Sequence, residues 1–486
     1  MLSKFFEAVL YLCSFLPFIF AVFGVAHYSL RNGGGRLLAL PIGLCFGPVL
    51  LSLVLEFFFA GFPRRSDAFY VTVVLSIGTS LALLSLVPMR KSLVAALANY
   101  RGLFERQLGL IDLSLLLLCL GGVVLALATA FLLPLRENDP LEYASTARQL
   151  LLLKDSTQYP FVNTDVSSGY YGPWSHGLGY INLWVWNGLL GDQQMGSAGA
   201  RLVSSYYVFA TGLALLSVNW GSLFRGRLIS ALLYIGTPII FVNAISSHID
   251  TIRIATFFLV LCLFYCYLLE KSNSLLLLSA FLSGLALYTH SLNLLILPLI
   301  GWVWLLHERK LSFGFFARGT LFIFLALIVV VPRYMKNVEV FGSPIADFNA
   351  VQVWQVESLY FEEWLRLARR LDSWFDRLFF GVGKGLSQPD RFGLAYYVFF
   401  VALILYVRDV MRDGIGAWRR FFITNSWTGY FFQISMIFMA MVIVSWAVGL
   451  DSFIKNERYT LTIQPIVLAF SIPIVVQKLK EKHGKD

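Results

Sequence analysis

The chain has 486 residues, of which 58% are hydrophobic and only 14% are charged, and 43 of them are phenylalanine. A water-soluble protein of this length could not bury so much apolar surface, so the composition indicates an all-α polytopic membrane protein. The net charge of +10 does not indicate a nucleic-acid partner, because the basic residues form short clusters between apolar runs rather than one basic face.

Apolar runs long enough to cross a bilayer recur along the whole chain. A spanning helix needs about 20 mostly apolar residues, and by that criterion the sequence predicts about thirteen spans. They cover residues 5–28, 37–60, 68–88, 111–133, 199–220, 228–246, 251–269, 274–289, 291–306, 314–332, 393–408, 428–449 and 458–477. The first run has no small-residue cleavage site, so we interpret it as a retained anchor rather than a signal peptide.

The lysines and arginines between the runs predict the orientation. If every run spans, the basic clusters from Arg36 to the tail Lys478–Lys485 fall on one side, and a single basic loop, Gly61–Arg65, falls on the other. Because Lys and Arg concentrate on the cytoplasmic side, the two long loops 134–198 and 333–392 are predicted to lie on the non-cytoplasmic face. The short loops elsewhere favour a bacterial inner (plasma) membrane, with the site on its periplasmic or extracellular side.

The five cysteines do not indicate a disulfide or a metal site. All of them (Cys13, Cys45, Cys119, Cys262 and Cys266) lie inside apolar runs, where a thiol behaves as a small hydrophobic group. Cys262 and Cys266 are one helical turn apart, but no histidine or carboxylate joins them at ligand spacing, so we interpret them as packing residues.

An acidic segment begins the first long loop. The segment Arg136–Tyr143 directly follows the apolar run Leu113–Leu135 and contains Glu137, Asp139 and Glu142. Charged groups at a membrane boundary are costly, so such a cluster is either fully solvated or functional. An Asp followed by a proline is also a common helix start, and this structural role is compatible with a catalytic one.

Both long loops contain patterns that a simple connection does not need. In the first, the turn-forming segment Tyr170–Gly177 contains Tyr170, Tyr171, Trp174 and His176. Aromatic rings stack on sugar faces, but Tyr and Trp are also the usual residues of a membrane interface, and taken alone this second interpretation is favoured. In the second loop, apolar residues at helical spacing over 361–378 predict a helix lying in the interface plane.

Several segments occur in an order known from one enzyme group. They are Asp139-Pro140-Leu141-Glu142-Tyr143, Tyr170-Tyr171-Gly172-Pro173-Trp174, Asp250 at a helix start, Gly284–His290, Pro332–Asn337 running to Pro344, and Arg458-Tyr459. From about residue 111 to 477 this order resembles the GT-C glycosyltransferases that take a sugar from a polyprenyl-phosphate carrier, a group that includes protein O-mannosyltransferases and bacterial lipid A aminoarabinose transferases. The resemblance implies a GT-C-like bundle with interfacial helices in its two long outer loops. Residues 111–486 would be the catalytic membrane domain and 1–110 an N-terminal transmembrane extension.

The resemblance implies sugar transfer by inverting direct displacement. The acceptor hydroxyl needs a base, and the departing phosphate needs cations. Asp139 is the expected base, with Glu142 or Glu137 as the second carboxylate. Family members commonly have adjacent acidic residues, whereas here Asn138 separates Glu137 from Asp139, so Glu142 competes for the role.

Four basic residues are candidates for the donor phosphate. Arg458 and Lys336 are the leading ones, followed by Arg333 and His290, because all four are predicted at outer helix ends. The arginine fork suits phosphate, and lysine acts as a point charge. The structural alternative for Lys336 and Arg333 is snorkelling to lipid headgroups. For His290 a bond to neighbouring backbone is the favoured alternative.

The remaining candidates would contact the substrate. They are Tyr143, Tyr170, Tyr171, Trp174, His176, Tyr459 and Asp250, and Asp250 could pair with His248. Glu56 lies within a predicted span and is expected to reach the interface or to pair inside the bundle. No cofactor is required, although paired carboxylates would also suit a divalent cation. The expected partners are a polyprenyl-phosphate sugar, a glycan, lipid or protein acceptor, and the bilayer.

Two other functions fit a chain of this class. A lipid or polysaccharide transporter or flippase would carry charged residues at mid-bilayer depth and repeated halves with broken helices. An oligosaccharide polymerase or ligase of another membrane family would rely on arginines rather than on an acidic first loop. The sequence shows no repeated order of segments, and most charges lie at predicted helix ends, so a glycosyltransferase is favoured.

Overall fold

The architecture is entirely helical. The structure is a computed structural model, and it describes residues 2–30, 35–87, 109–135, 138–161, 177–191, 198–218, 224–308, 312–341, 388–412, 426–447 and 457–483. No strand occurs in these residues. The predicted all-α class is therefore confirmed for the part of the chain that the structure describes.

The helices vary widely in length. The first half of the chain contains α1 (Leu2–Cys13), α2 (Leu16–Ser29), η1 (Gly35–Leu38), α3 (Ala39–Gly61), α4 (Asp67–Leu86), α6 (Leu110–Leu132), α7 (Asn138–Leu153), η3 (Ser156–Gln158), α8 (Leu178–Leu189), α9 (Ala198–Ser217), α10 (Phe224–Ile235) and α11 (Pro238–Ile245). The second half contains α12 (Asp250–Glu270), α13 (Asn273–Thr289), η5 (Ser291–Leu295), α14 (Ile296–His307), α15 (Phe313–Ile328), α16 (Val331–Phe341), α21 (Pro389–Phe392), α22 (Ala395–Arg412), α24 (Trp427–Ala447), η6 (Glu457–Ile463) and α26 (Gln464–His483).

Fewer helices than predicted are suited to cross a membrane. Within the described ranges, seven segments are long and apolar enough: Leu2–Ser29, Gly35–Gly61, Asp67–Leu86, Leu110–Leu132, Ala198–Ser217, Asp250–Glu270 and Thr460–Lys482. Counting the pairs α10–α11 and α15–α16 as one span each raises the number to nine. The fold fits a polytopic helical membrane protein, but the prediction of about thirteen spans is not confirmed. The predicted spans 274–289 and 291–306 form apolar helices that are too short to count.

Both of these helix pairs are sharply bent. The bend between α10 and α11 is 60°, and that between α15 and α16 is 61°. Pro238 is the first residue of α11, and Pro332 is the second residue of α16. A proline removes one backbone donor and clashes with the preceding helical turn, which explains why both helices break at these points.

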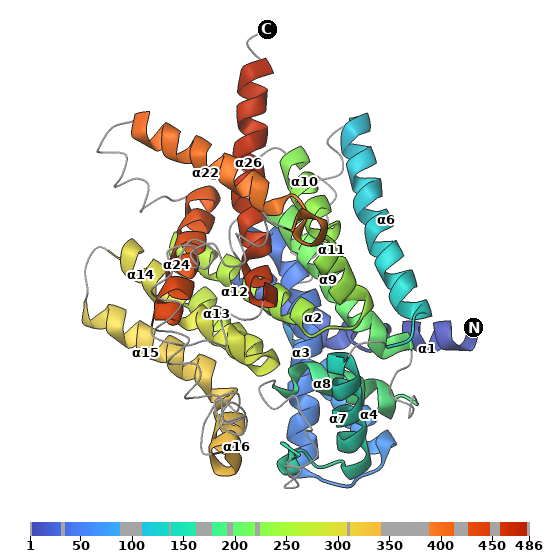
Figure 1. Cartoon of the computed structure of the whole chain (residues 1–486). Coiled ribbons are helices and arrows are strands. Elements are labelled where there is room, and N and C mark those ends of the chain that lie inside the picture. Colours follow the sequence, from blue (N-terminus) through green and yellow to red (C-terminus); the bar gives the residue numbers. More distant parts are fainter. Residues whose placement is uncertain are drawn as a thin grey trace, which may run out of the picture.

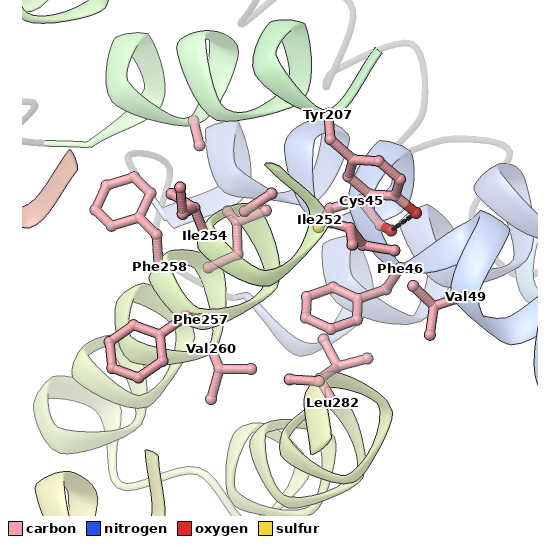
Figure 2. Close-up of a cluster of buried hydrophobic side chains, with 14 of the residues drawn as sticks. Cys45, Phe46, Val49, Tyr207, Ile252, Ile254, Phe257, Phe258, Val260 and Leu282 are labelled. Carbon is pink, nitrogen blue, oxygen red and sulfur yellow. Dashed lines mark hydrogen bonds between the residues drawn. The ribbon is translucent and has the colours of Figure 1, made fainter. Parts of the chain in front are cut away.

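The core is organised around α12, which is buried on all sides from Asp250 to Leu268. A helix that is apolar all round is expected in the centre of a bundle. Figure 2 shows side chains of α12 between α3, which contributes Cys45 and Phe46, and α13, which contributes Leu282. In the same cluster the Tyr207 hydroxyl of α9 donates to the Cys45 carbonyl at 3.2 Å. The N-terminal helices therefore share one hydrophobic core with the rest of the bundle.

A glycine permits the close contact between α2 and α3. A Cβ atom at Gly47 would lie 2.6 Å from the backbone nitrogen of Ile19, closer than such atoms approach in proteins. Small residues let apolar helices pack backbone to backbone, and α2 and α3 pack closely in this way.

Helix ends from the predicted outer loops meet at one end of the bundle. The Arg64 amide donates to the Lys154 carbonyl at 3.2 Å, and the Ser156 hydroxyl donates to the Glu56 carbonyl at 3.2 Å. In Figure 1, α7, α8 and α16 lie at the lower end, whereas α26 ends at the top. The basic loop Gly61–Arg65 therefore lies beside the first long loop, in agreement with the prediction that both are on the non-cytoplasmic side.

Several partly exposed ion pairs lie at the opposite end of the bundle. Arg225 lies 2.8 Å from Asp112, and Lys478 lies 2.9 Å from Asp409. Lys271 follows α12, and its ammonium lies 3.3 Å from Glu308. Since a helix of this length extends over about 30 Å, the two ends are separated by roughly the thickness of a bilayer core. The positive-inside rule predicts that this second end faces the cytoplasm.

Cysteine labelling in intact cells tests this orientation. Cys13 is the one exposed native cysteine, so the new cysteines are introduced into a Cys13→Ser variant. We expect a cysteine at the exposed Gln158 position to react with a membrane-impermeant maleimide, and one at Lys480 to react only after permeabilisation. The reverse pattern would invert the topology and place the site in the cytoplasm.

Candidate functional site

The C-terminal end of α6, which precedes the acidic segment, is anchored by an arginine of α9. Arg201 at the start of α9 donates to the carbonyl of Phe131 at 3.0 Å and to that of Leu133, at the C-terminus of α6. A cation at a helix C-terminus satisfies free carbonyls and the helix dipole. α7 then begins at Asn138, which places Asp139 in its first turn, where a negative charge is stabilised.

Asp139 lies beside a buried histidine. Its Oδ2 atom is 3.8 Å from Nδ1 of His248; the histidine side chain is 4% exposed, and that of Asp139 is 33% exposed. The sequence suggested that His248 could pair with Asp250. In the structure, Oδ1 of Asp250 lies 3.1 Å from Nη2 of Arg253 in a buried ion pair.

The backbone that carries His248 is held in an uncommon conformation. Ser247 has a φ of +63°, in the left-handed region that few non-glycine residues adopt. Its carbonyl accepts a 2.5 Å hydrogen bond from the Tyr180 hydroxyl, and the His248 carbonyl accepts one of 2.8 Å from Ser204. Such backbone persists only where the surroundings impose it, and it occurs preferentially at functional sites. The position of His248 opposite Asp139 is therefore set by α8 and α9 together.

Glu142 forms a second acidic group on the same face of α7. It follows Asp139 by three residues, so the two side chains are neighbours on the helix surface. Burial, and then the negative charge of Asp139, raises the pKa of the Glu142 carboxyl group to about 7. A carboxyl group that titrates near neutral pH can take up or release a proton under physiological conditions.

Two of the predicted substrate contacts are buried in this region. Tyr143 packs edge-on against Tyr180, with ring centroids 5.5 Å apart. Its ring fixes α7 against α8. Asp250 is in contact with Arg253, as described above. Both side chains support the site from within the bundle.

The predicted phosphate ligands lie in different environments. His290 is buried, and its Nδ1 accepts a hydrogen bond from the Leu292 amide at 3.0 Å, which is the backbone contact considered as its structural alternative. Lys336 is partly exposed on α16 and lies 3.0 Å from Glu339. Arg333, one turn earlier, points inward and is only 9% exposed. Its guanidinium carbon lies 4.1 Å from the centre of the Tyr159 ring, a cation–π contact.

A second polar group lies around Glu56 of α3. The Tyr288 hydroxyl donates to the Glu56 carboxylate, and Asn182 of α8 donates to the Tyr288 hydroxyl at 3.0 Å. Arg333 interacts electrostatically with the same carboxylate. We call Glu56, Tyr288, Asn182, Arg333 and Tyr159 the Glu56 cluster. The sequence predicted that Glu56 would reach the interface or pair inside the bundle, and the residues around it come from distant parts of the chain.

The helix α8 connects the two polar groups. Tyr180 bonds the backbone beside His248, whereas Asn182 bonds Tyr288, and residues two apart in a helix point in nearly opposite directions. Gly177 allows α8 to begin against α13, because a Cβ there would lie 1.8 Å from the Tyr288 carbonyl oxygen. The Asp139 and Glu56 sides of the site are thus built on opposite faces of one short helix.

Several predicted residues lie outside the described part of the chain. They are Glu137, Tyr170, Tyr171, Trp174, His176 and the predicted interfacial helix 361–378. Arg458 and Tyr459 belong to η6, but their side chains are not described. In the residues that are described, no group of three or more His, Cys, Asp or Glu side chains could hold a metal ion.

Comparison with protein-family models, curated proteins and solved structures finds no match to this chain.

Proposed function

We propose that this protein is a membrane glycosyltransferase that uses a polyprenyl-phosphate sugar as donor. The observation that carries the proposal is the Asp139–Glu142 carboxylate pair, which lies beside His248 at the same end of the bundle as Arg333. In this proposal the full chain is a GT-C-like bundle of about thirteen spans. The site faces the periplasmic or extracellular side of a bacterial inner membrane.

The reaction is a direct displacement at the anomeric carbon. The acceptor hydroxyl oxygen attacks that carbon from the face opposite the phosphate, and its proton passes to Asp139. The new glycosidic bond forms as the bond between carbon and phosphate oxygen breaks, with inversion of configuration. Polyprenyl phosphate leaves with both electrons of that bond, and the positive charge of Arg333 stabilises it.

The neighbours of Asp139 have distinct roles in this mechanism. The buried His248 ring limits the orientations of the Asp139 carboxylate and is a positioning residue. Glu142 is the second carboxylate, one helical turn from Asp139, and its own pKa is raised by burial and by the charge of Asp139.

The pH dependence of sugar transfer should reflect the titration of the Glu142 carboxyl group. We expect the rate to rise as the pH increases through about 7, because the Glu142 carboxyl group loses its proton there and its ionised form is the active one. A Glu142→Gln variant should lose this inflection while retaining part of its activity. An unchanged profile in that variant would assign the inflection to another group.

A transporter or flippase is the second candidate. The two bent helix pairs, at 60° and 61°, are of the kind that transporters use to build binding sites at membrane depth. The buried Asp250–Arg253 pair at the start of α12 also fits that class. A flippase moves the lipid carrier between leaflets without splitting it from the sugar.

Release of the carrier separates these functions. The purified protein is incubated with a panel of polyprenyl-phosphate sugars, and the products are analysed by mass spectrometry. The proposal expects polyprenyl phosphate to be released with the wild-type protein and about a hundredfold less with Asp139→Asn. Movement of intact donor between leaflets, with no carrier released from any sugar, would favour the flippase.

A further inference from the structure

The Tyr180 side chain contacts both halves of the Asp139–His248 pair. Its ring packs against the ring of Tyr143, which follows Asp139 by four residues in α7, and its hydroxyl bonds the backbone that carries His248. We propose that Tyr180 is a positioning residue that sets the distance between the Asp139 carboxylate and the His248 ring. The consequence of this distance for sugar transfer rests on the function proposed above.

The ring of Tyr180 fixes the turn of α7 that carries Asp139. Tyr180 is fully buried and Tyr143 is 2% exposed, and the two rings meet edge-on with an interplanar angle of 84°. Residues four apart are neighbours on a helix surface, so Asp139 lies one turn from this contact. The aromatic pair therefore holds the Asp139 turn at a set distance from α8.

The hydroxyl of Tyr180 fixes the backbone next to His248. It donates to the Ser247 carbonyl at 2.5 Å and lies 3.0 Å from the Ser204 hydroxyl, which donates to the His248 carbonyl at 2.8 Å. Ser247 has a φ of +63°, which a residue with a side chain adopts only where its surroundings impose it. Loss of the Tyr180 hydroxyl would allow Ser247 to return to a common conformation and turn the His248 ring away from Asp139.

Two other hydrogen bonds of His248 are local to its own segment. Its amide donates to the Asn243 carbonyl at 3.0 Å, and its carbonyl also accepts a bond from Thr251 at 3.2 Å. Because these partners lie within five residues of His248, they move with the segment and do not fix it relative to α7. The Tyr180 hydroxyl connects this segment to the helix that also contacts α7.

A zinc bridge measures the separation of the two halves without requiring catalysis. In the Cys13→Ser variant, Asp139→Cys introduces a thiol at the position where the carboxylate lies 3.8 Å from Nδ1 of His248. One zinc ion bridges a thiolate sulfur and an imidazole nitrogen that are up to about 4 Å apart. Zinc should therefore slow the reaction of the introduced thiol with a maleimide, and adding His248→Gln should abolish this protection.

Tyr180→Phe in the same background tests the hydroxyl alone. Phenylalanine keeps the ring that packs against Tyr143, but the Ser247 carbonyl loses its donor. We expect the zinc concentration that gives half protection to rise about tenfold, in line with the loss of one buried hydrogen bond. The matched control is Tyr430→Phe, which removes a fully buried hydroxyl that donates to the Leu261 carbonyl at 2.7 Å. It should need no more zinc than the parent variant.

Ser204→Ala provides a second variant on the same backbone. It removes one donor to the His248 carbonyl, whereas the Thr251 hydroxyl still bonds that carbonyl. The zinc concentration for half protection should therefore rise less than in Tyr180→Phe. Thermal unfolding in detergent identifies any variant that has lost its fold.

The outcomes separate this inference from the proposed function. Unchanged zinc protection in folded Tyr180→Phe, or an equal loss in Tyr430→Phe, overturns the positioning role even if the wild-type protein transfers sugar. Protection that survives His248→Gln also overturns it. A loss specific to Tyr180→Phe supports the role even if no sugar donor is split and the glycosyltransferase proposal fails.

Sugar transfer gives a further readout where the proposed function holds. Tyr180→Phe should lower kcat about tenfold and leave the KM for the donor unchanged, because the hydroxyl positions the catalytic pair rather than binding donor. A raised KM with an unchanged kcat would contradict the positioning role.

Discussion

Replacing Asp139 with asparagine is expected to reduce sugar transfer at least about a hundredfold, the lower range of what a positioned base contributes. The amide keeps the size of the side chain and an oxygen for the first turn of α7, but it cannot accept the acceptor's proton. Because Asp139 is 33% exposed, the substitution should cost little packing. Initial rates of polyprenyl phosphate release, at equal amounts of folded protein, measure the effect.

Glu142→Gln and His248→Gln are the matched controls for this experiment. Each should lose less activity than Asp139→Asn, because neither side chain takes the acceptor's proton in the proposed mechanism. An inactive Glu142→Gln together with an active Asp139→Asn would make Glu142 the base. If all three variants transfer sugar at the wild-type rate, the proposed mechanism is wrong.

The second large effect is expected on stability. Asp250→Asn removes the carboxylate charge that lies 3.1 Å from the fully buried guanidinium of Arg253. Breaking a buried ion pair from one side costs about 3–5 kcal/mol, because the remaining charge stays in an apolar interior. We expect a clear fall in the thermal unfolding temperature in detergent, followed by tryptophan fluorescence.

A double variant distinguishes this role from substrate binding. Asp250→Asn combined with Arg253→Met removes both charges and should recover most of the lost stability. If Asp250 instead contacts substrate, as its position in the sequence suggested, Asp250→Asn would keep its unfolding temperature and raise the KM for the donor.

The class of the protein and the main acidic candidates follow from local features of the sequence. Hydropathy over about 20 residues identifies a membrane helix because each spanning helix satisfies its own backbone. The same reasoning identified the acidic segment with Asp139 and Glu142, since charge at the end of an apolar run stands out locally. The span count was less predictable, because bends such as those before Pro238 and after Ile328 depend on how neighbouring helices pack.

The partners of the charged groups were decided by tertiary structure. Asp139 lies beside His248 and Glu56 beside Tyr288, pairs that are separated by about a hundred residues or more in the sequence. Hydropathy carries no information on which helix faces which. A buried polar side chain needs a hydrogen-bonding partner, and the helix that packs against it must supply that partner. In this fold α8 contacts both pairs: Tyr180 on one face bonds the backbone beside His248, and Asn182 on the other face bonds Tyr288.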